Sequence, residues 1–164
     1  MDEGTKVNFR ILPLHQLQDY ENETSEKHIV VQYRTPGRNY PHITYGKTCQ
    51  NILTIRCHDV ENPPTEFNNQ VIRDYPDFYV PPIIHFSEED AKNIIRFVHE
   101  TLDIYDIDTI VCQCDAGISR SSATAAALSK IINNDDFWVF ENKNYVPNNT
   151  IYKMILNAYY ESKE

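Results

Sequence analysis

Apolar residues recur with two different spacings along the chain, and these spacings predict both strands and helices. Short apolar runs rich in β-branched residues predict strands at 7–12, 28–33, 51–57 and 109–113. Apolar residues three and four positions apart predict helices at 88–105, 122–132 and 149–158, with a shorter helix at 15–20. The remaining stretches, 21–27, 34–47, 58–86 and 137–147, are expected to connect these elements.

Capping residues support the boundaries of two predicted helices. Ser87 precedes three acidic residues, an arrangement that favours a helix N-terminus, and Asn148 can cap the last helix. The helix after Ser87 is expected to bury one face, made of Ala91, Ile94, Ile95, Val98, Leu102 and Tyr105. Trp138 is expected to anchor the connector at 137–147 by packing.

The order of these elements predicts an α/β fold. We expect a small central, mostly parallel sheet of about four to five strands that is flanked by helices. No repeat, low-complexity segment or interdomain linker interrupts residues 1–164, so a single domain is expected. Ligand sites in open α/β sheets form at the carboxyl ends of the strands, and we expect the functional site there.

Charge and cysteine content narrow the classes of partner. The net charge of −9 argues against nucleic acid and anionic membranes as partners. No apolar run is long enough to span a membrane, and the acidic first residues do not resemble a signal peptide. We therefore expect a monomeric cytoplasmic protein with reduced thiols at Cys49, Cys57, Cys112 and Cys114.

One stretch combines the residues that bind and attack an oxyanion. Cys114 ends an apolar strand, and a short loop then leads into a helix made of small residues. Backbone N–H groups of such a loop and of a helix N-terminus bind anions, and Gly117 permits a tight turn. Arg120 offers two parallel donors to a tetrahedral oxyanion, and the positive surroundings favour a thiolate at Cys114. Ser121 could hydrogen-bond that thiolate.

The stretch Cys-x5-Arg-Ser on a strand, loop and helix resembles the phosphate-binding loop of cysteine-based protein tyrosine phosphatases. Residues 117–121, Gly-Ile-Ser-Arg-Ser, are similar to the form in dual-specificity-like phosphatases, and the chain looks closest to small microbial predicted tyrosine phosphatases. The resemblance implies hydrolysis of phosphotyrosine, with phosphoserine and phosphothreonine as further candidates, through a phosphocysteine intermediate without metal or cofactor. It implies that phosphate is held by Asp115, Ala116, Gly117, Ile118, Ser119, Arg120 and Ser121.

The leaving group needs an acid, and several carboxyl groups are candidates. Asp59 follows the strand at 51–57 directly, so it would emerge beside Cys114 if the two strands run parallel. The resemblance places an aspartate at this position in related small phosphatases. Glu61, Asp74 and Asp77 remain alternatives on the same stretch. Asp115 is expected to point away from bound phosphate, where it could orient a backbone amide or face the leaving group.

One residue departs from the family pattern, and one basic loop has two possible interpretations. The family usually has histidine before the catalytic cysteine, whereas this chain has Gln113, so we expect a less stabilised thiolate and lower activity. The loop at 34–47 carries Arg34, Arg38 and Lys47, which are interpreted as solvated, with a basic rim for phosphorylated substrates as the alternative.

Three other functions compete with a phosphatase. A non-catalytic module could bind phosphorylated residues through the same loop. A redox protein could pair Cys114 with Cys49 or Cys57, although Cys112 is poorly placed to pair with it on one strand. A zinc site is less favoured because the cysteines and histidines lack the usual ligand spacing.

Overall fold

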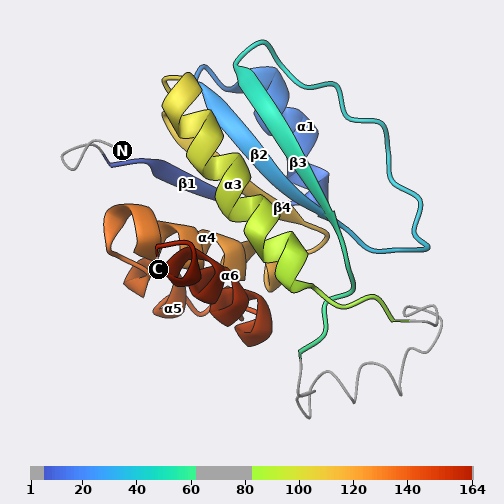
Figure 1. Ribbon diagram of the computed structural model, residues 1–164. Helices are drawn as coiled ribbons and strands as arrows, with labels where there is room; N and C mark the ends of the chain where they lie inside the picture. The colour runs from blue at the N-terminus through green and yellow to red at the C-terminus, as the bar shows by residue number, and fades with distance from the viewer. Residues whose placement is uncertain (1–5, 62–82, 164) are drawn as a thin grey trace.

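The computed structural model of the protein describes residues 6–61 and 83–163 (Figure 1). The strands are β1 Asn8–Pro13, β2 His28–Arg34, β3 Cys49–Arg56 and β4 Thr109–Cys114. The helices are α1 Leu14–Glu23, α3 Glu88–Ile104, α4 Arg120–Asn133, α5 Phe137–Phe140 and α6 Asn149–Glu161. These elements confirm the predicted α/β class.

The four strands form one parallel sheet in the order β1-β4-β2-β3. Every residue of the two central strands, β2 and β4, is buried, because helices cover both faces of a parallel sheet. Pro13 pairs in register with Cys114, and Arg34 pairs with Arg56. The carboxyl ends of the strands therefore meet at one edge of the sheet.

Helices cover the two faces of the sheet unequally. Figure 1 shows α1 on one face, and α3, α4 and α6 on the other. Side chains of a strand alternate between its faces, so Val30 and Val111 pack with Leu17 of α1. The neighbouring residues Ile29 and Ile110 belong to the larger core beneath α3, α4 and α6. The stretch 114–121, whose sequence resembles a phosphate-binding loop and which we call the phosphate loop, thus lies where the buried central strand β4 leads into the buried helix α4.

The predicted caps are confirmed at two helices. The Oγ of Ser87 accepts a hydrogen bond from Asp90 N at 3.0 Å, and Asp90 Oδ2 accepts one from Ser87 N at 2.9 Å. This reciprocal pair is a capping box. The Oδ1 of Asn148 accepts from Ile151 N at 3.0 Å at the start of α6.

Three local expectations are corrected by tertiary contacts. The helix expected at 15–20 extends to Glu23, because the Glu21 carboxylate is buried against His28 instead of lying in a polar loop. Tyr105 does not join the buried face of α3, since the helix ends at Ile104 and Tyr105 takes an extended backbone. The connector at 137–147 contains the short helix α5.

Trp138 fulfils its expected role as an anchor. Its indole Nε1 donates to Ser129 Oγ at 3.0 Å, and its ring centroid lies 6.3 Å from that of Phe9. Most of the connector expected at 58–86 lies outside the described residues. Among the helices that are described, none is both long enough and apolar enough to cross a membrane.

Candidate active site

The Cys114 side chain lies at the end of β4 and faces the first turn of α4. Its Sγ is 3.0 Å from Ser121 Oγ, and Ser121 N points at it from 3.4 Å. Cys114 is 2% exposed, and Ser121 is fully buried. The first turn of α4 and the Ser121 hydroxyl group therefore both face this one sulfur.

Gly117 allows the loop to turn between the strand and the helix. Its φ of +69° lies in the left-handed region, and a Cβ built there would come within 2.6 Å of Pro13 N. The loop therefore needs glycine for its backbone angle and for its close approach to the end of β1. Neighbouring Ala116 and Ile118 are exposed, and Ile118 O accepts a hydrogen bond from Val146 N at 3.0 Å.

Arg120 begins α4 and holds its guanidinium inside the loop. It is 4% exposed, and its Nη1 donates to Cys57 O at 2.7 Å. Its Nη2 donates to Asp115 Oδ2 at 3.2 Å. Burial alone would lower the pKa of Arg120, but nearby anionic groups, Cys114 first among them, raise it. The guanidinium therefore remains a permanent cation beside the sulfur.

The structure brings Asp59 to the phosphate loop. Asp59 follows β3, and its Oδ1 accepts hydrogen bonds from Ser119 Oγ at 2.8 Å and from Asn148 Nδ2 at 2.9 Å. Asn148 Nδ2 also donates to Val60 O at 3.0 Å, so the start of α6 holds this segment in place. The strands β3 and β4 both run parallel to β2, so their carboxyl ends lie at the same edge of the sheet, as expected.

The alternative acids are placed differently. Glu61 Oε1 accepts a hydrogen bond from Asn149 N at 3.4 Å, which directs this carboxylate to the N-terminus of α6. Asp74 and Asp77 lie outside the described residues. Among the described carboxyl groups, Asp59 and Asp115 are the two that hydrogen-bond residues of the phosphate loop.

Two roles were expected for Asp115, to orient a backbone amide or to face the leaving group, and its hydrogen bonds among the described residues do not include the first. Its Oδ2 accepts instead from three side chains of the segment that follows β2: Thr35 Oγ1 at 2.9 Å, Arg38 Nη1 at 2.6 Å and Tyr40 OH at 3.1 Å. With Arg120, four donors converge on this one oxygen. Such convergence suits an ionised carboxylate that ties the 35–40 segment to the loop, which disfavours Asp115 as the acid.

Arg34 is one of the residues of this site, with Thr35 and Tyr40, that the sequence pattern did not predict. It was interpreted as part of a solvated loop, but it is 7% exposed because it is the last residue of the central strand β2. Its Nη1 donates to Gln113 Oε1 at 2.7 Å, and Gln113 Nε2 donates to Cys114 O at 2.8 Å. The position of Arg34 directly after a buried apolar run was the available signal.

The other cysteines give little support to redox chemistry. All four cysteines are free thiols. Burial raises the pKa of Cys57 to about 12, and burial also raises the pKa of Cys112. Protonated, buried thiols attack disulfides slowly, so these two are poor partners for Cys114.

One cluster away from the loop has residue types that could bind a metal. Glu21, His28 and Cys49 have candidate ligand atoms within 4.8 Å of one another. However, His28 Nε2 lies 2.5 Å from Glu21 Oε2, and His28 Nδ1 lies 2.9 Å from Glu26 O. Both ring nitrogens face an acceptor, which fits a protonated imidazole in a buried ion pair better than a metal ligand.

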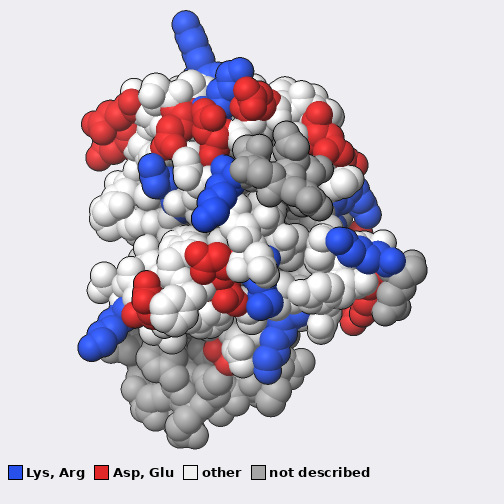
Figure 2. Space-filling model, turned by 90° about the vertical axis from the view of Figure 1, so that its left-hand side faces the viewer, with Lys and Arg blue, Asp and Glu red and all other residues white. Residues whose placement is uncertain are grey.

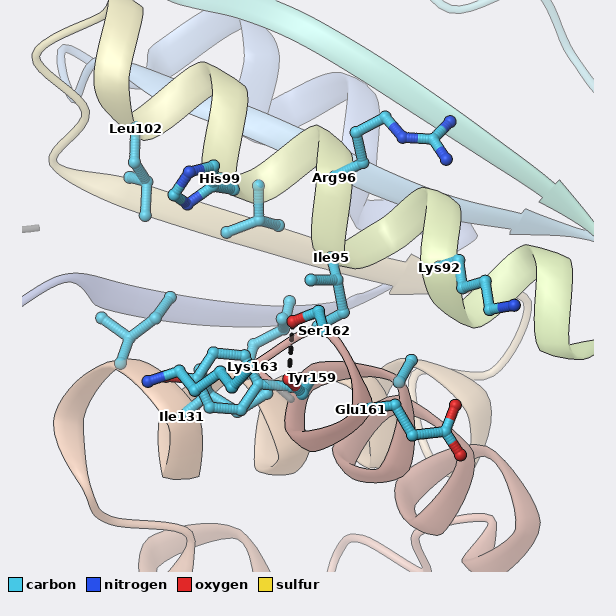
Figure 3. A pocket seen from close by; sticks show the side chains of 14 residues that line it. Lys92, Ile95, Arg96, His99, Leu102, Ile131, Tyr159, Glu161, Ser162 and Lys163 are labelled. Atoms are coloured by element: carbon cyan, nitrogen blue, oxygen red, sulfur yellow. Dashed lines mark hydrogen bonds between the residues drawn. The ribbon is translucent and has the colours of Figure 1, made fainter.

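A separate cavity of about 700 Å³ lies between α3, α4 and α6 (Figure 3). Its apolar lining residues include Ile95, Leu102 and Ile131. Lys163 and Tyr159 also line it, and Lys163 Nζ lies 4.6 Å from the Tyr159 ring centroid. No residue of the loop 115–121 lines this cavity, so it is distinct from the candidate active site.

Comparison of the whole chain with solved structures identifies its fold. The crystal structure of human DUSP28 aligns with a TM-score of 0.56 at 10% identity, covering 95% of both chains. The chain has the fold of the dual-specificity phosphatases. PTPMT1 in complex with PI(5)P aligns with a TM-score of 0.54 at 9% identity, covering 99% of this chain and 94% of its own.

A third similar structure belongs to a phosphatase-like protein. Human tyrosine phosphatase-like serine/threonine/tyrosine-interacting protein aligns with a TM-score of 0.52 at 16% identity, covering 96% of this chain and 94% of its own. No family model and no curated protein sequence matches the chain. At these identities, the dual-specificity phosphatase fold tells us the architecture, and the chemistry must be argued from the site itself.

Proposed function

We propose that this protein is a cysteine-dependent phosphatase that hydrolyses phosphotyrosine in proteins or peptides, without metal or cofactor. The observation that carries the proposal is the position of Cys114 Sγ, 3.0 Å from Ser121 Oγ at the start of the helix that also carries Arg120. A nucleophile, a fixed cation and a helix N-terminus thus lie within one loop and the first turn of one helix. This is the set of groups that in-line attack on a phosphate requires.

The proposed reaction has two steps. Cys114 Sγ attacks phosphorus, and an S–P bond forms as the P–O bond to the leaving group breaks. Arg120 and the backbone N–H groups of residues 115–121 hold the equatorial oxygens during this step. Asp59 gives its proton to the leaving oxygen. In the second step Asp59 takes a proton from water, the water oxygen attacks phosphorus, and the thiolate leaves with phosphate as the product.

Asp59 is the acid that the geometry supports best. Its contact with Ser119 holds it against the loop, and its contact with Asn148 fixes it from the other side. The carboxylate therefore borders the phosphate-binding loop without occupying it. Asp115 is instead engaged by four donors, and Glu61 is directed to α6.

The substrate class follows from charge. Figure 2 shows acidic and basic side chains mixed over one face of the molecule, with acidic groups gathered toward its upper edge. With a net charge of −9, phosphate affinity has to arise locally from Arg120 and the loop amides. The loop contains Asp115 and no lysine, which favours a single phosphate on a peptide over a polyanionic lipid headgroup such as the one bound by PTPMT1.

The reactive thiol also supports the prediction of a reducing, cytoplasmic location.

Turnover of para-nitrophenyl phosphate tests the proposal. The wild type is assayed in EDTA with a reductant, beside Cys114→Ser and the matched control Cys49→Ser, whose sulfur is remote from the loop. We expect activity that survives the chelator, persists in the control and is lost in Cys114→Ser. Absence of wild-type turnover, with vanadate or phosphopeptide still bound, would instead identify a non-catalytic phosphoresidue-binding module.

A further inference from the structure

We propose that Arg34 is a positioning residue that stabilises the Cys114 thiolate through Gln113. This arrangement would replace the histidine that usually precedes the catalytic cysteine in this class of phosphatase. The catalytic consequence rests on the proposed function. The effect on the thiol itself does not, because it can be measured without any turnover.

The contacts of Arg34 form a short, buried relay. Its Nη1 donates to Tyr33 O at 3.1 Å and to Gln113 Oε1 at 2.7 Å, and its Cζ lies 4.7 Å from the Tyr40 ring centroid. These contacts hold the guanidinium at the end of β2, the strand that pairs with β4. Its orientation is thus fixed from three sides.

The side chain of Gln113 connects Arg34 to the backbone of Cys114. Its side chain is fully buried, and its Nε2 donates to Cys114 O at 2.8 Å. A guanidinium can only donate, so the amide oxygen must face Arg34 and the amide nitrogen must face the Cys114 carbonyl. Arg34 therefore sets the direction of the amide dipole, and the amide holds the backbone from which the nucleophile projects.

Arg34 differs from the other arginines around the loop in the groups that its guanidinium contacts. Arg38 and Arg120 each form an ion pair with Asp115, at 2.6 Å and 3.2 Å. No carboxylate of the described residues forms an ion pair with Arg34, whose donors meet neutral oxygens. A buried cation without an anion is destabilising. Side chains alternate along β4, so Gln113 and Cys114 face opposite sides of the sheet, and Arg34 would act on the thiolate through the amide and the backbone without direct contact.

Glutamine carries no charge, so Gln113 by itself would leave the thiolate less stabilised than a histidine would. The structure supplies a charge behind the glutamine. A cation near a titrating thiol favours the ionised form, whether it is a histidine next to the cysteine or a buried arginine reached through an amide. A purely structural arginine, serving only to end β2, would not affect the ionisation of Cys114.

Alkylation of Cys114 by iodoacetamide across about pH 5 to pH 9 measures the thiolate directly. Mass spectrometry reads the modification at Cys114 separately from the other cysteines. We expect Arg34→Gln to move the midpoint of the alkylation profile upward by about one pH unit, and Arg34→Lys to recover part of this shift. The matched control is Arg56→Gln, because Arg56 is the exposed register partner of Arg34 on β3.

A second variant tests whether the effect passes through Gln113. In a Gln113→His background the imidazole supplies its own charge, so Arg34→Gln should move the midpoint by less than it does beside glutamine. A profile for Arg34→Gln that overlays the wild type, in protein with an unchanged thermal melt, would overturn the proposal. An equal shift in Arg56→Gln would also overturn it, since it would indicate a general field and not a relay.

The outcome for Arg34 can be separated from the outcome for the phosphatase reaction. If the wild type hydrolyses para-nitrophenyl phosphate but Arg34→Gln leaves the alkylation profile unchanged, only the relay is wrong. If the wild type shows no turnover but Arg34→Gln shifts the profile, the relay is supported and the proposed function is wrong. Should Arg34→Gln fail to fold, Gln113→Leu provides the comparison, because it keeps the arginine but removes the amide that links Arg34 to Cys114.

Discussion

Ser119 Oγ donates a 2.8 Å hydrogen bond to Asp59 Oδ1, and this bond joins the phosphate loop to the segment that follows β3. The two residues lie 60 positions apart in sequence, yet they meet because both follow strands that run in the same direction. Asn148 Nδ2 donates to the same carboxylate oxygen at 2.9 Å, so three elements hold Asp59 in place. In the proposed reaction, these contacts hold Asp59 beside the loop that would bind phosphate.

The first prediction concerns the proton donor. Asp59→Asn keeps the size and both hydrogen bonds but removes the transferable proton, so kcat should fall by roughly 10²–10⁴-fold on a substrate with a poor leaving group. The matched control is Glu61→Gln, because Glu61 is directed to α6 and should be dispensable. Full activity in Asp59→Asn would assign the role to another acid.

The second prediction concerns the shape of the loop. Gly117→Ala should destabilise the protein by about 1–2 kcal/mol for the left-handed backbone angle, with a further cost for the Cβ that meets Pro13 N at 2.6 Å. Oxyanion binding should be lost with it. Gly37→Ala is the control, since Gly37 also has positive φ, at 86°, but is exposed. Urea unfolding and vanadate affinity provide the two measurements, and equal losses in both variants would contradict the prediction.

The third prediction concerns the 35–40 segment. Asp115→Asn removes the carboxylate charge that attracts Arg38 and Arg120, so the segment should detach and become sensitive to protease near Arg38. We expect KM for a phosphopeptide to change while the Cys114 thiol still reacts with iodoacetamide. Limited proteolysis followed by mass spectrometry checks this. Unchanged cleavage would mean that Thr35 and Tyr40 hold the segment without the charge.

The fourth prediction concerns the pH dependence of stability on the other face of the sheet. Burial alone would lower the pKa of His28, but hydrogen bonds with Cys49 and Glu21 raise it from 6.5 to about 10. A raised pKa in the folded state means that the stabilisation is complete below about pH 6.5 and is lost as the pH rises toward 10. The free energy of unfolding should therefore decrease over this interval.

Comparison with Glu21→Gln isolates this contribution from other groups that titrate at high pH. Glutamine cannot attract the protonated imidazole, so the wild type should exceed the variant in stability at about pH 6 and by much less at about pH 10. Denaturant unfolding at several pH values gives the difference directly. A constant difference across the range would mean that His28 does not gain its proton on folding.

Local sequence determined the secondary structure and the phosphate loop. The strands, the capped helices at 88–104 and 149–161 and the turn at Gly117 depend on apolar spacing, capping side chains and backbone angles. These properties act over a few residues, so they can be read directly from the chain. The spacing between Cys114 and Arg120 is equally local, because one loop and one helix turn place both around the same space.

Tertiary structure alone decided which distant residues complete the site. Asp115 meets Thr35, Arg38 and Tyr40, and Gln113 meets Arg34, because β2 lies beside β4 in the sheet. The same pairing buries Arg34, which its own neighbours in sequence had suggested was solvated. Strand order depends on the packing of whole faces and not on local propensity, so the sequence pattern could predict the loop at 114–121 and the position of Asp59 beside it, but not the contacts of Arg34 and Arg38.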